Sequence, residues 1–422
     1  MLFSVLLLLL LVCGTDAGFH GFVYMYTSKS AAGNGYLVVK HAKMSYSACY
    51  EVDQWFCGSC AGNTYDTIPE SEESTGNWCQ RDKIWGGFGT SYSSSSASWG
   101  GVNWLPNTNG VTKWKAVLYN EMRKRSDVNK PNSTPQTTTI PTIRIPSNCP
   151  RNISLLKFDP DKDEVRCRHA VSSSGECYTC TPPSILSLSS SCSLSFNPTS
   201  SSDEGAYAVQ LMMEDFPRQT ITLTDSSNLE ETKTPSDFIS KIPVQFLVRV
   251  YSAIPSCIEG LYLPRFLPPT PENGAQIYAD VNQLLEITIR AEATLSTITD
   301  LLVSRPYNMA KSTSGSGNFT LRWTPSESQA NESHPICFIV ETRYSGFLHQ
   351  SEHRCVIVTV RTLHIFYLKM KISTTLSLVN DKEIIEEAIK DELVRRGIPL
   401  IVRVRLLGGD LVEVRTIPHT SD

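Results

Sequence analysis

Short stretches in which apolar and polar residues alternate constrain this chain most, because a period of two belongs to half-buried β-strands. The clearest examples are "YAVQLMMED" at 207–215, "VQFLVRV" at 244–250, "LLEITIRAEA" at 284–293 and "FTLRW" at 319–323. Proline, serine and aspartate separate these stretches, as they separate the strands of β-sandwiches. The sequence therefore predicts two β-sandwiches, at 146–256 and 257–360.

The segments before the sandwiches differ from them in composition. Residues 18–124 are rich in cysteine and tryptophan, and segments such as "TKWKAVLY" at 112–119 indicate a mostly β domain. Residues 125–145 are rich in proline, threonine, serine and asparagine, so we expect an exposed linker there. The predicted fold class is mainly β, with a disulfide-bonded N-terminal domain in front of the sandwiches.

The last segment, 361–422, has a different pattern and predicts a small βαββ unit of the α+β type. A strand precedes a helix in which Ile385, Ile389 and Leu393 form an apolar stripe at i, i+4 spacing. Asn380 is the candidate N-cap of this helix. The stretch after the helix predicts a hairpin that turns at Gly408–Gly409.

The N-terminus predicts a secreted protein. Residues 1–17 combine an apolar run with small residues near Ala17, which is typical of a cleaved signal peptide. No later stretch is long and apolar enough to predict a transmembrane segment. The net charge of −4 gives no reason to expect nucleic acid as a partner. Four sequons predict glycosylation, at Asn132, Asn152, Asn318 and Asn331.

Cysteine usage agrees with secretion, since twelve of the thirteen cysteines follow the predicted signal peptide and an even number predicts disulfides. They are Cys49, Cys57, Cys60, Cys79, Cys149, Cys167, Cys177, Cys180, Cys192, Cys257, Cys337 and Cys355. The first predicted sandwich holds five of them and the second holds three. We expect one bridge to cross the boundary, although two free thiols or a misplaced boundary would also explain the odd counts.

Two cysteine pairs have the spacing of redox motifs, "CGSC" at 57–60 and "CYTC" at 177–180. A redox pair needs a helix N-terminus to stabilise its thiolate, and neither pair is followed by a helical pattern. We therefore interpret both as structural.

The sequence "HQSEH" at 349–353 matches the H-x-x-E-H pattern of inverted zinc peptidases, with His349, Glu352 and His353 as the matching residues. That chemistry requires a helix, so that both histidines face one zinc ion. Here the motif lies between two strand patterns, so a zinc hydrolase is a remote alternative. We expect a protein without enzymatic activity.

The stretch "FDPDKDE" at 158–164 places Asp159, Asp161 and Asp163 at alternate positions. Three carboxylates at this spacing form either a calcium site or a solvated turn. An EF-hand is excluded, because its sixth and twelfth positions would need glycine and glutamate. No other cofactor is expected.

The same stretch resembles the D-P-D-G-D-x-hydrophobic segment of cadherin-like and immunoglobulin-like repeats, in some of which the acidic residues bind calcium. Lys162 replaces the usual glycine and adds a positive charge. More widely, residues 126–360 resemble an uncharacterised vertebrate family of secreted extracellular mosaic proteins, loosely related to von Willebrand D and EGF domain proteins. The matching segments include "DEVRCR", "EDFPRQTI" and "GLYLPRF". This resemblance implies cadherin-like or immunoglobulin-like sandwiches and an extracellular location.

These observations favour a protein that works by binding a cell-surface receptor or an extracellular-matrix partner. Six of the seven tryptophans lie in 18–124, where they form either an exposed binding surface or simply the core. The alternative function is a structural component of matrix, coat or mucus that associates with itself.

Overall fold

The computed structural model describes residues 18–30, 35–57, 70–73, 78–306, 308–362, 364–369, 375–377, 380–396, 402–408 and 411–416. The predicted signal peptide and Cys60 lie outside these residues. The fold is mainly β, as predicted from the alternating stretches. The chain divides into two compact units, the second of which consists mainly of Thr359–Asp422. Among the described residues, no helix is long and apolar enough to cross a membrane.

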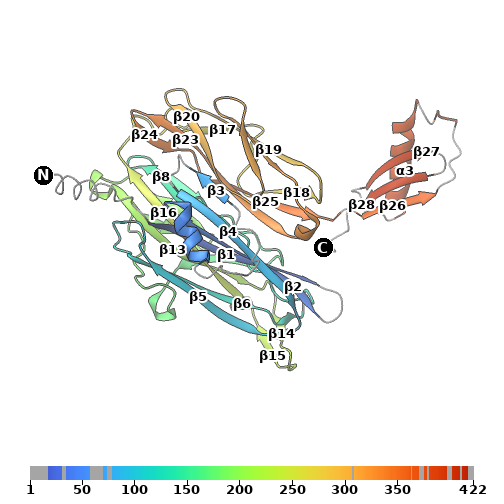
Figure 1. The fold of residues 1–422 in the computed structure, drawn as a ribbon, viewed down its shortest axis with the longest axis horizontal. Coiled ribbons are helices and arrows are strands. Elements are labelled where there is room, and N and C mark those ends of the chain that lie inside the picture. The colour runs from blue at the N-terminus through green and yellow to red at the C-terminus, as the bar shows by residue number, and fades with distance from the viewer. Residues whose placement is uncertain are drawn as a thin grey trace, which may run out of the picture. The chain divides into compact units, whose positions relative to one another are not determined.

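The largest sheet combines strands from both sides of the predicted linker (Figure 1). Its main path runs β10-β13-β16-β1-β2-β4-β3, while β6 and β8 also pair with β16 and β5 pairs with β6. These strands are β1 (Phe19–Ser30), β2 (Tyr36–Tyr46), β3 (Glu70–Glu73), β4 (Trp78–Gly89), β5 (Ser94–Val102), β6 (Lys113–Glu121), β8 (Thr142–Pro146), β10 (Glu164–His169), β13 (Gly205–Phe216) and β16 (Ser240–Tyr251). The segments 18–124 and 146–256 therefore share one sheet.

Strands β13 and β16 have neighbours on both sides in this sheet and are buried almost throughout. The predicted inward residues, such as Val209 and Phe246, are buried, but so are the alternate residues Gln210 and Leu247. Both faces of these strands are covered, so the alternation does not separate a core face from a solvent face.

The predicted linker is not exposed, and this corrects the sequence interpretation. Residues 131–147 are buried almost completely. Thr134 N donates to Tyr26 O over 3.0 Å, and β8 runs parallel to β16. The hydroxyl of Thr138 lies 2.6 Å from that of Ser304. Because the threonine hydroxyls and the backbone find partners inside the protein, this polar composition is compatible with burial.

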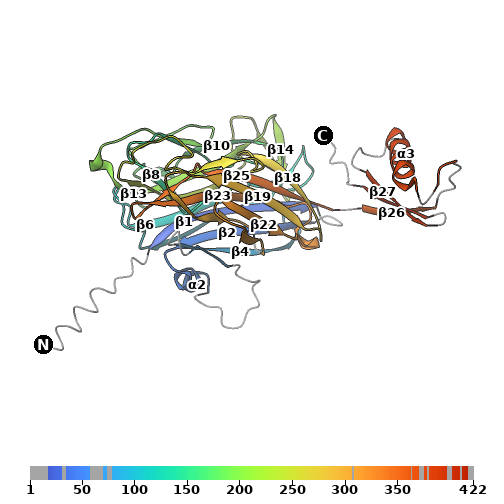
Figure 2. The ribbon, with the colours of Figure 1, turned by 90° about the horizontal axis from the view of Figure 1, so that it is seen from above.

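Two small sheets accompany the large one. One has the order β11-β12-β9, and the other β15-β14-β7. Their strands are β7 (Lys124–Arg125), β9 (Arg151–Ser154), β11 (Leu186–Leu188), β12 (Ser193–Phe196), β14 (Ile221–Thr224) and β15 (Glu230–Lys233). The helix α2 (Cys49–Cys57) packs beside β2 and β4, as Figure 2 shows.

The strands that follow residue 257 form two sheets, with the orders β17-β19-β22-β21 and β18-β25-β23-β20, and β24 pairs with β23. They are β17 (Arg265–Leu267), β18 (Ala275–Asp280), β19 (Leu285–Glu292), β20 (Thr297–Ser304), β21 (Ala310–Thr313), β22 (Asn318–Trp323), β23 (Ser333–Tyr344), β24 (Phe347–Gln350) and β25 (Arg354–Arg361). The inward positions predicted in β22 are buried, as are Ile287 and Ile289 in β19. This arrangement confirms the second sandwich.

The expected bridge across the predicted boundary is present, as Cys149–Cys257. The segment predicted as a linker is joined to the second predicted sandwich by an ion pair in which Arg144 Nη1 donates to Glu341 Oε1 over 2.7 Å, with both side chains buried. Gln350 Oε1 accepts a further hydrogen bond from the backbone N–H of Arg144 over 2.7 Å. Burial makes this ion pair dependent on both partners, since either charge alone would lie in a poorly solvated site.

The C-terminal segment has the predicted βαββ order, with the sheet β26-β28-β27. Its elements are β26 (His364–Lys369), α3 (Lys382–Arg395), β27 (Val402–Gly408) and β28 (Leu411–Thr416). The stripe of Ile385, Ile389 and Leu393 is buried together with Val412 and Val414. The N-cap is Asp381 rather than Asn380, because the helix begins at Lys382. Gly409, in the predicted turn, lies outside the described residues.

The tryptophans of the N-terminal domain belong to its core. Trp78, Trp104 and Trp114 are buried, and Phe19 stacks on Trp114 with 4.6 Å between the ring centroids. Trp55, Trp85 and Trp99 are partly buried against the same core. Of the two interpretations that the sequence left open, the core is therefore the correct one.

Candidate functional site

The segment "FDPDKDE" forms a tight turn whose carboxylates point to different partners. Asp159 Oδ1 accepts hydrogen bonds from the backbone N–H groups of Asp161 and Asp163, over 2.9 and 3.1 Å. Lys162 adopts a left-handed conformation with φ of 68°, at the position where related turns have glycine. Asp161 pairs with Lys130 and accepts from Ser133 N over 2.6 Å.

Asp215, near the end of β13, lies beside two of the three aspartates of the turn, Asp159 and Asp163. One carboxylate oxygen from each of Asp159, Asp163 and Asp215 lies within 4.8 Å of the others, and all three residues are buried. Asp215 Oδ1 accepts from Ser240 N and Ser240 Oγ, each over 2.7 Å. Asp215 Oδ2 accepts from the amide of Asn132 over 2.6 Å.

The positive charge in this cluster comes from Arg125, whose side chain is fully buried. Its guanidinium contacts both oxygens of Asp163 and donates to Asp127 over 2.7 and 3.0 Å. It also contacts Asn132 Oδ1. The buried charge of Arg125, at the end of β7, thus connects the turn to the segment that was predicted as a linker.

Burial determines the protonation of the aspartate cluster. Burial, and then the charges of Asp215 and the two other aspartates of the turn, raises the pKa of Asp159 well above its usual value. Burial and the charge of Asp163 raise the pKa of Asp215 to about 7. Asp159 Oδ2 has no hydrogen-bond partner in the described part of the chain. Asp159 and Asp215 are therefore expected to hold protons at a higher pH than ordinary carboxyl groups do, and Asp215 is about half protonated at pH 7.

The structure therefore changes the predicted calcium site. Asp159 and Asp163 come together, but Asp161 turns away to Lys130, and Asp215 takes its place. Both oxygens of Asp163 already contact Arg125. This donor set fits a cluster neutralised by arginine and a proton better than a calcium cage, which needs several free oxygens. Calcium binding stays a prediction.

Neither Arg125 nor Asp215 is recognisable in the sequence as a member of this cluster. The "RKR" of 123–125 suggests a solvated strand end, and nothing in the sequence marks its last arginine as buried. Asp215 follows an apolar run, and the pairing of Val165 with Asp215 places it beside the turn that precedes β10. Only the correct pairing of β10 with β13 would have revealed this proximity.

The residues of the H-x-x-E-H pattern do not converge. His349 lies in β24, Glu352 pairs with Arg354, and His353 is buried beside Cys355 with 3.7 Å between ring nitrogen and sulfur. Cys337 and His353 approach Cys355 closely, but the two cysteines form a disulfide. In the described residues, His349 and Glu352 belong to no group that could hold a metal.

Ten of the predicted cysteines form disulfides. The pairs are Cys49–Cys79, Cys149–Cys257, Cys167–Cys192, Cys177–Cys180 and Cys337–Cys355. The "CYTC" pair is thus a bridge, while the "CGSC" pair falls on Cys60 and on the side chain of Cys57, which are not described.

Two of the predicted glycosylation sites are exposed, Asn152 and Asn331, and Asn318 is partly exposed. Asn132 is fully buried, and its amide bridges Arg125 and Asp215. A glycan cannot be carried on this side chain in the folded protein, so the prediction for Asn132 is corrected.

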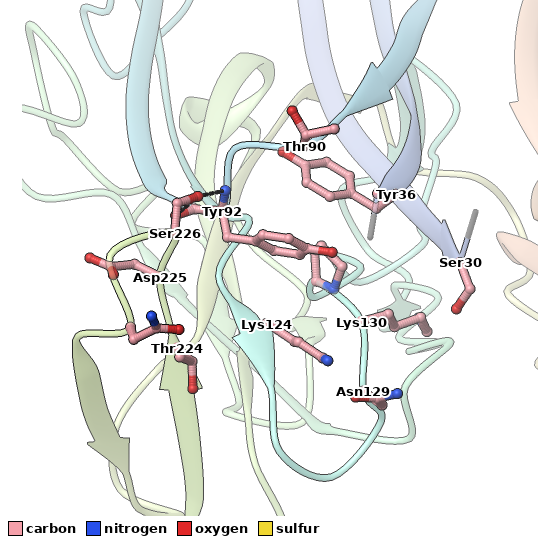
Figure 3. Close-up of a pocket in the computed structure, with 13 residues that line it drawn as sticks. Ser30, Tyr36, Thr90, Tyr92, Lys124, Asn129, Lys130, Thr224, Asp225 and Ser226 are labelled. Atoms are coloured by element: carbon pink, nitrogen blue, oxygen red, sulfur yellow. Dashed lines mark hydrogen bonds between the residues drawn. The ribbon is translucent and has the colours of Figure 1, made fainter. Parts of the chain in front are cut away.

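A surface pocket of about 560 Å³ lies where the start of β2, the loop after β4 and the turn between β14 and β15 meet (Figure 3). The rings of Tyr36 and Tyr92 lie 5.2 Å apart between centroids. Figure 3 shows the Tyr92 ring between Tyr36 and Lys124. This pocket is not recognisable in the sequence, because its residues are far apart along the chain and carry no motif.

No protein-family model matches the chain, and no curated protein matches it in sequence. Among solved structures, it is similar to the sialic acid binding region of a Streptococcus sanguinis adhesin, at 10% identity, with 68% of this chain and 96% of the other covered and a TM-score of 0.20. An endo-fucoidan hydrolase of glycoside hydrolase family 107 has 12% identity, coverage of 72% and 38%, and a TM-score of 0.19. Extracellular domains 3–5 of Drosophila OTK have 12% identity, coverage of 68% and 88%, and a TM-score of 0.16. Scores this low say nothing about what this chain binds.

Proposed function

We propose that this protein is a secreted, non-enzymatic glycoprotein that binds a partner at the cell surface or in the extracellular matrix. Its five described disulfides fit folding in an oxidising compartment. The protein would belong to the family of extracellular mosaic proteins that residues 126–360 resemble.

The observation that carries this proposal is the pocket beside Tyr36 and Tyr92. It offers two aromatic rings and several amide and hydroxyl groups in an open cavity. The described residues of its lining include neither a histidine nor a pair of carboxylates, which general acid–base catalysis commonly uses. Such a lining suits recognition of a ligand rather than its chemical conversion.

Binding of the tagged protein to cells tests this function. We expect saturable binding that is lost in Tyr92→Leu and retained in the matched control Tyr50→Leu, since Tyr50 is an exposed tyrosine on α2. The same experiment with calcium and with a chelator tests whether calcium takes part. Failure of the wild-type protein to bind any cell type or matrix preparation would refute the proposed function.

A second candidate function is self-assembly, and strand β5 supports it. This strand pairs only with β6 among the described strands, and most of its residues are exposed. An exposed edge of nine residues can pair with an edge of a second copy. A molar mass that rises with protein concentration in light scattering, and that falls when Ala97 is replaced by proline, would favour this function.

A further inference from the structure

The pocket beside Tyr36 and Tyr92 is held in a fixed shape by its own hydrogen bonds. Tyr36 donates its hydroxyl to Ser91 O over 2.8 Å. Tyr92 N donates to Ser226 Oγ over 2.6 Å, the bond drawn in Figure 3, and Ser226 N donates to Tyr92 O over 3.1 Å. These bonds tie the loop after β4 to the turn after β14. A preformed site loses little conformational entropy on binding, so even a small polar ligand can be held there.

The turn between β14 and β15 is also stabilised internally. Asp225 Oδ1 accepts from Ser227 N over 2.7 Å and from Leu229 N over 2.9 Å. In Figure 3 the carboxylate of Asp225 points away from Tyr92. Asp225, the only acidic residue among the described residues of the lining, is therefore engaged in its own turn and does not face the tyrosines.

The pocket contains two lysines, and their situations differ. Lys130 pairs with Asp161, so its charge is already compensated. Lys124 is exposed, and no hydrogen bond or ion pair of its ammonium group is found within the described residues. Its backbone pairs with Thr224, which places its side chain on the β14 side of the pocket, below Tyr92 in Figure 3. An uncompensated cation at the pocket favours a ligand that carries a negative charge.

The other groups in the lining are small and polar. Thr90, Asn129 and Asn228 supply a hydroxyl and two amides, each of which both donates and accepts hydrogen bonds. The two tyrosines supply aromatic faces, against which the C–H face of a sugar ring can pack while its hydroxyls reach the amides. A peptide bound by strand addition would need a free strand edge, and one anchored by apolar side chains would need a deep apolar pocket; the described lining offers neither.

We infer that this pocket binds an acidic saccharide, with the sugar ring against Tyr92 and Tyr36 and its anionic group beside Lys124. This inference rests on the proposed binding function and specifies its ligand. The anion is a carboxylate or a sulfate, since both would satisfy one ammonium group and neighbouring amide donors.

The test uses the full secreted protein on an array of glycans in matched sets, in which each neutral core is also present with a terminal sialic acid, a glucuronic acid or a sulfate ester. We expect binding to acidic members over their neutral cores, and the preferred acid identifies the anion. Titration calorimetry with the best glycan should then show at least tenfold weaker binding for Lys124→Gln and for Tyr92→Leu. The control Lys113→Gln, an exposed lysine at the start of β6, should bind like the wild type.

Thermal unfolding of each variant shows whether it is folded. Equal binding of neutral and acidic glycans would overturn the role of Lys124, and unchanged affinity in folded Tyr92→Leu would overturn the site. If cells bind the wild type while no glycan does, or if an acidic peptide competes where acidic glycans do not, the saccharide inference is wrong and the proposed function survives. If the wild type binds neither glycans nor cells, both fail.

Discussion

Replacing Asp215 by asparagine removes one of the three carboxylates in the buried cluster of Asp159, Asp163 and Asp215 and should change how stability depends on pH. The pKa of Asp215 is raised from 3.8 to about 7 in the folded protein. The folded state therefore binds more protons than the unfolded state between pH 4 and 7, so this group costs stability as pH rises through that range. A shift of this size corresponds to about 4 kcal/mol, of which about 2.5 kcal/mol develops between pH 5 and pH 8.

The asparagine side chain in Asp215→Asn cannot ionise, so the variant should not lose stability in this way as pH rises. Its amide still accepts from Ser240, but an NH₂ group now faces the amide of Asn132, which costs about 1–3 kcal/mol at every pH. The variant should thus be less stable than the wild type at pH 5 and should recover about 2.5 kcal/mol relative to the wild type at pH 8.

Other groups influence the same pH range but cancel in the comparison. Burial lowers the pKa of His20 to about 3 and that of His353 to about 4. The unfolded state then binds more protons below pH 6.5, so these histidines cost stability as pH falls. The histidines are present in both proteins, so the difference between variant and wild type reports on Asp215 and on the carboxyl groups coupled to it, Asp159 and Asp163.

The assay is urea unfolding followed by tryptophan fluorescence at pH 5, 6, 7 and 8, with disulfides intact. Glu230→Gln, which neutralises an exposed carboxylate on β15, serves as the control and should follow the wild type at every pH. A stability difference between Asp215→Asn and the wild type that stays constant from pH 5 to pH 8 would refute the raised pKa and the proton-retaining cluster.

Three further perturbations test other parts of the structure. Arg144→Met should destabilise the protein by about 3–5 kcal/mol in urea unfolding, because it leaves buried Glu341 without its cation. Adding Glu341→Leu to the same chain should restore much of that loss. If the losses of the two single variants simply add up in the double variant, the two side chains do not act as a pair. Replacing both cysteines of Cys149–Cys257 by serine should lower the free energy of unfolding by about 5 kcal/mol, and the same change at Cys177–Cys180 should lower it by about 1.5 kcal/mol. The difference is expected because the sequence separations of the two bridges are 108 and 3. Equal losses would show that the entropy of the unfolded chain is not the main cause. Asn152→Gln should remove one glycan in a gel-shift assay, and Asn132→Gln should remove none but lower the unfolding midpoint, since buried Asn132 contacts Arg125 and Asp215.

The local part of this fold is readable from the sequence, because strand alternation and helix periodicity depend on near neighbours. The stripe at Ile385, Ile389 and Leu393 and the alternation in β19 and β22 are confirmed for that reason. Counting cysteines against a boundary predicted that one bridge would cross it, and the structure shows that Cys149 and Cys257 form that bridge.

Long-range pairing was not readable in this way. The buried path of 131–147 depends on partners such as Tyr26 and Ser304, which lie more than 100 residues away in sequence. Composition therefore suggested a linker. The aspartate cluster was not predicted for the same reason. Asp215 lies near the end of β13, and the cluster's partners Arg125 and Ser240 come from β7 and from the start of β16.

The pairing of β1 with β16 has a consequence for synthesis of the chain. Strand β16 begins about 210 residues after β1 ends, so the large sheet cannot close until most of the protein has been made. At a synthesis rate of roughly 5–20 residues per second, β16 is made about 10–40 seconds after β1. During that interval the apolar edge of β1 is open to chaperones or to another nascent chain, whereas Cys49 and Cys79, only 30 residues apart, can already be joined.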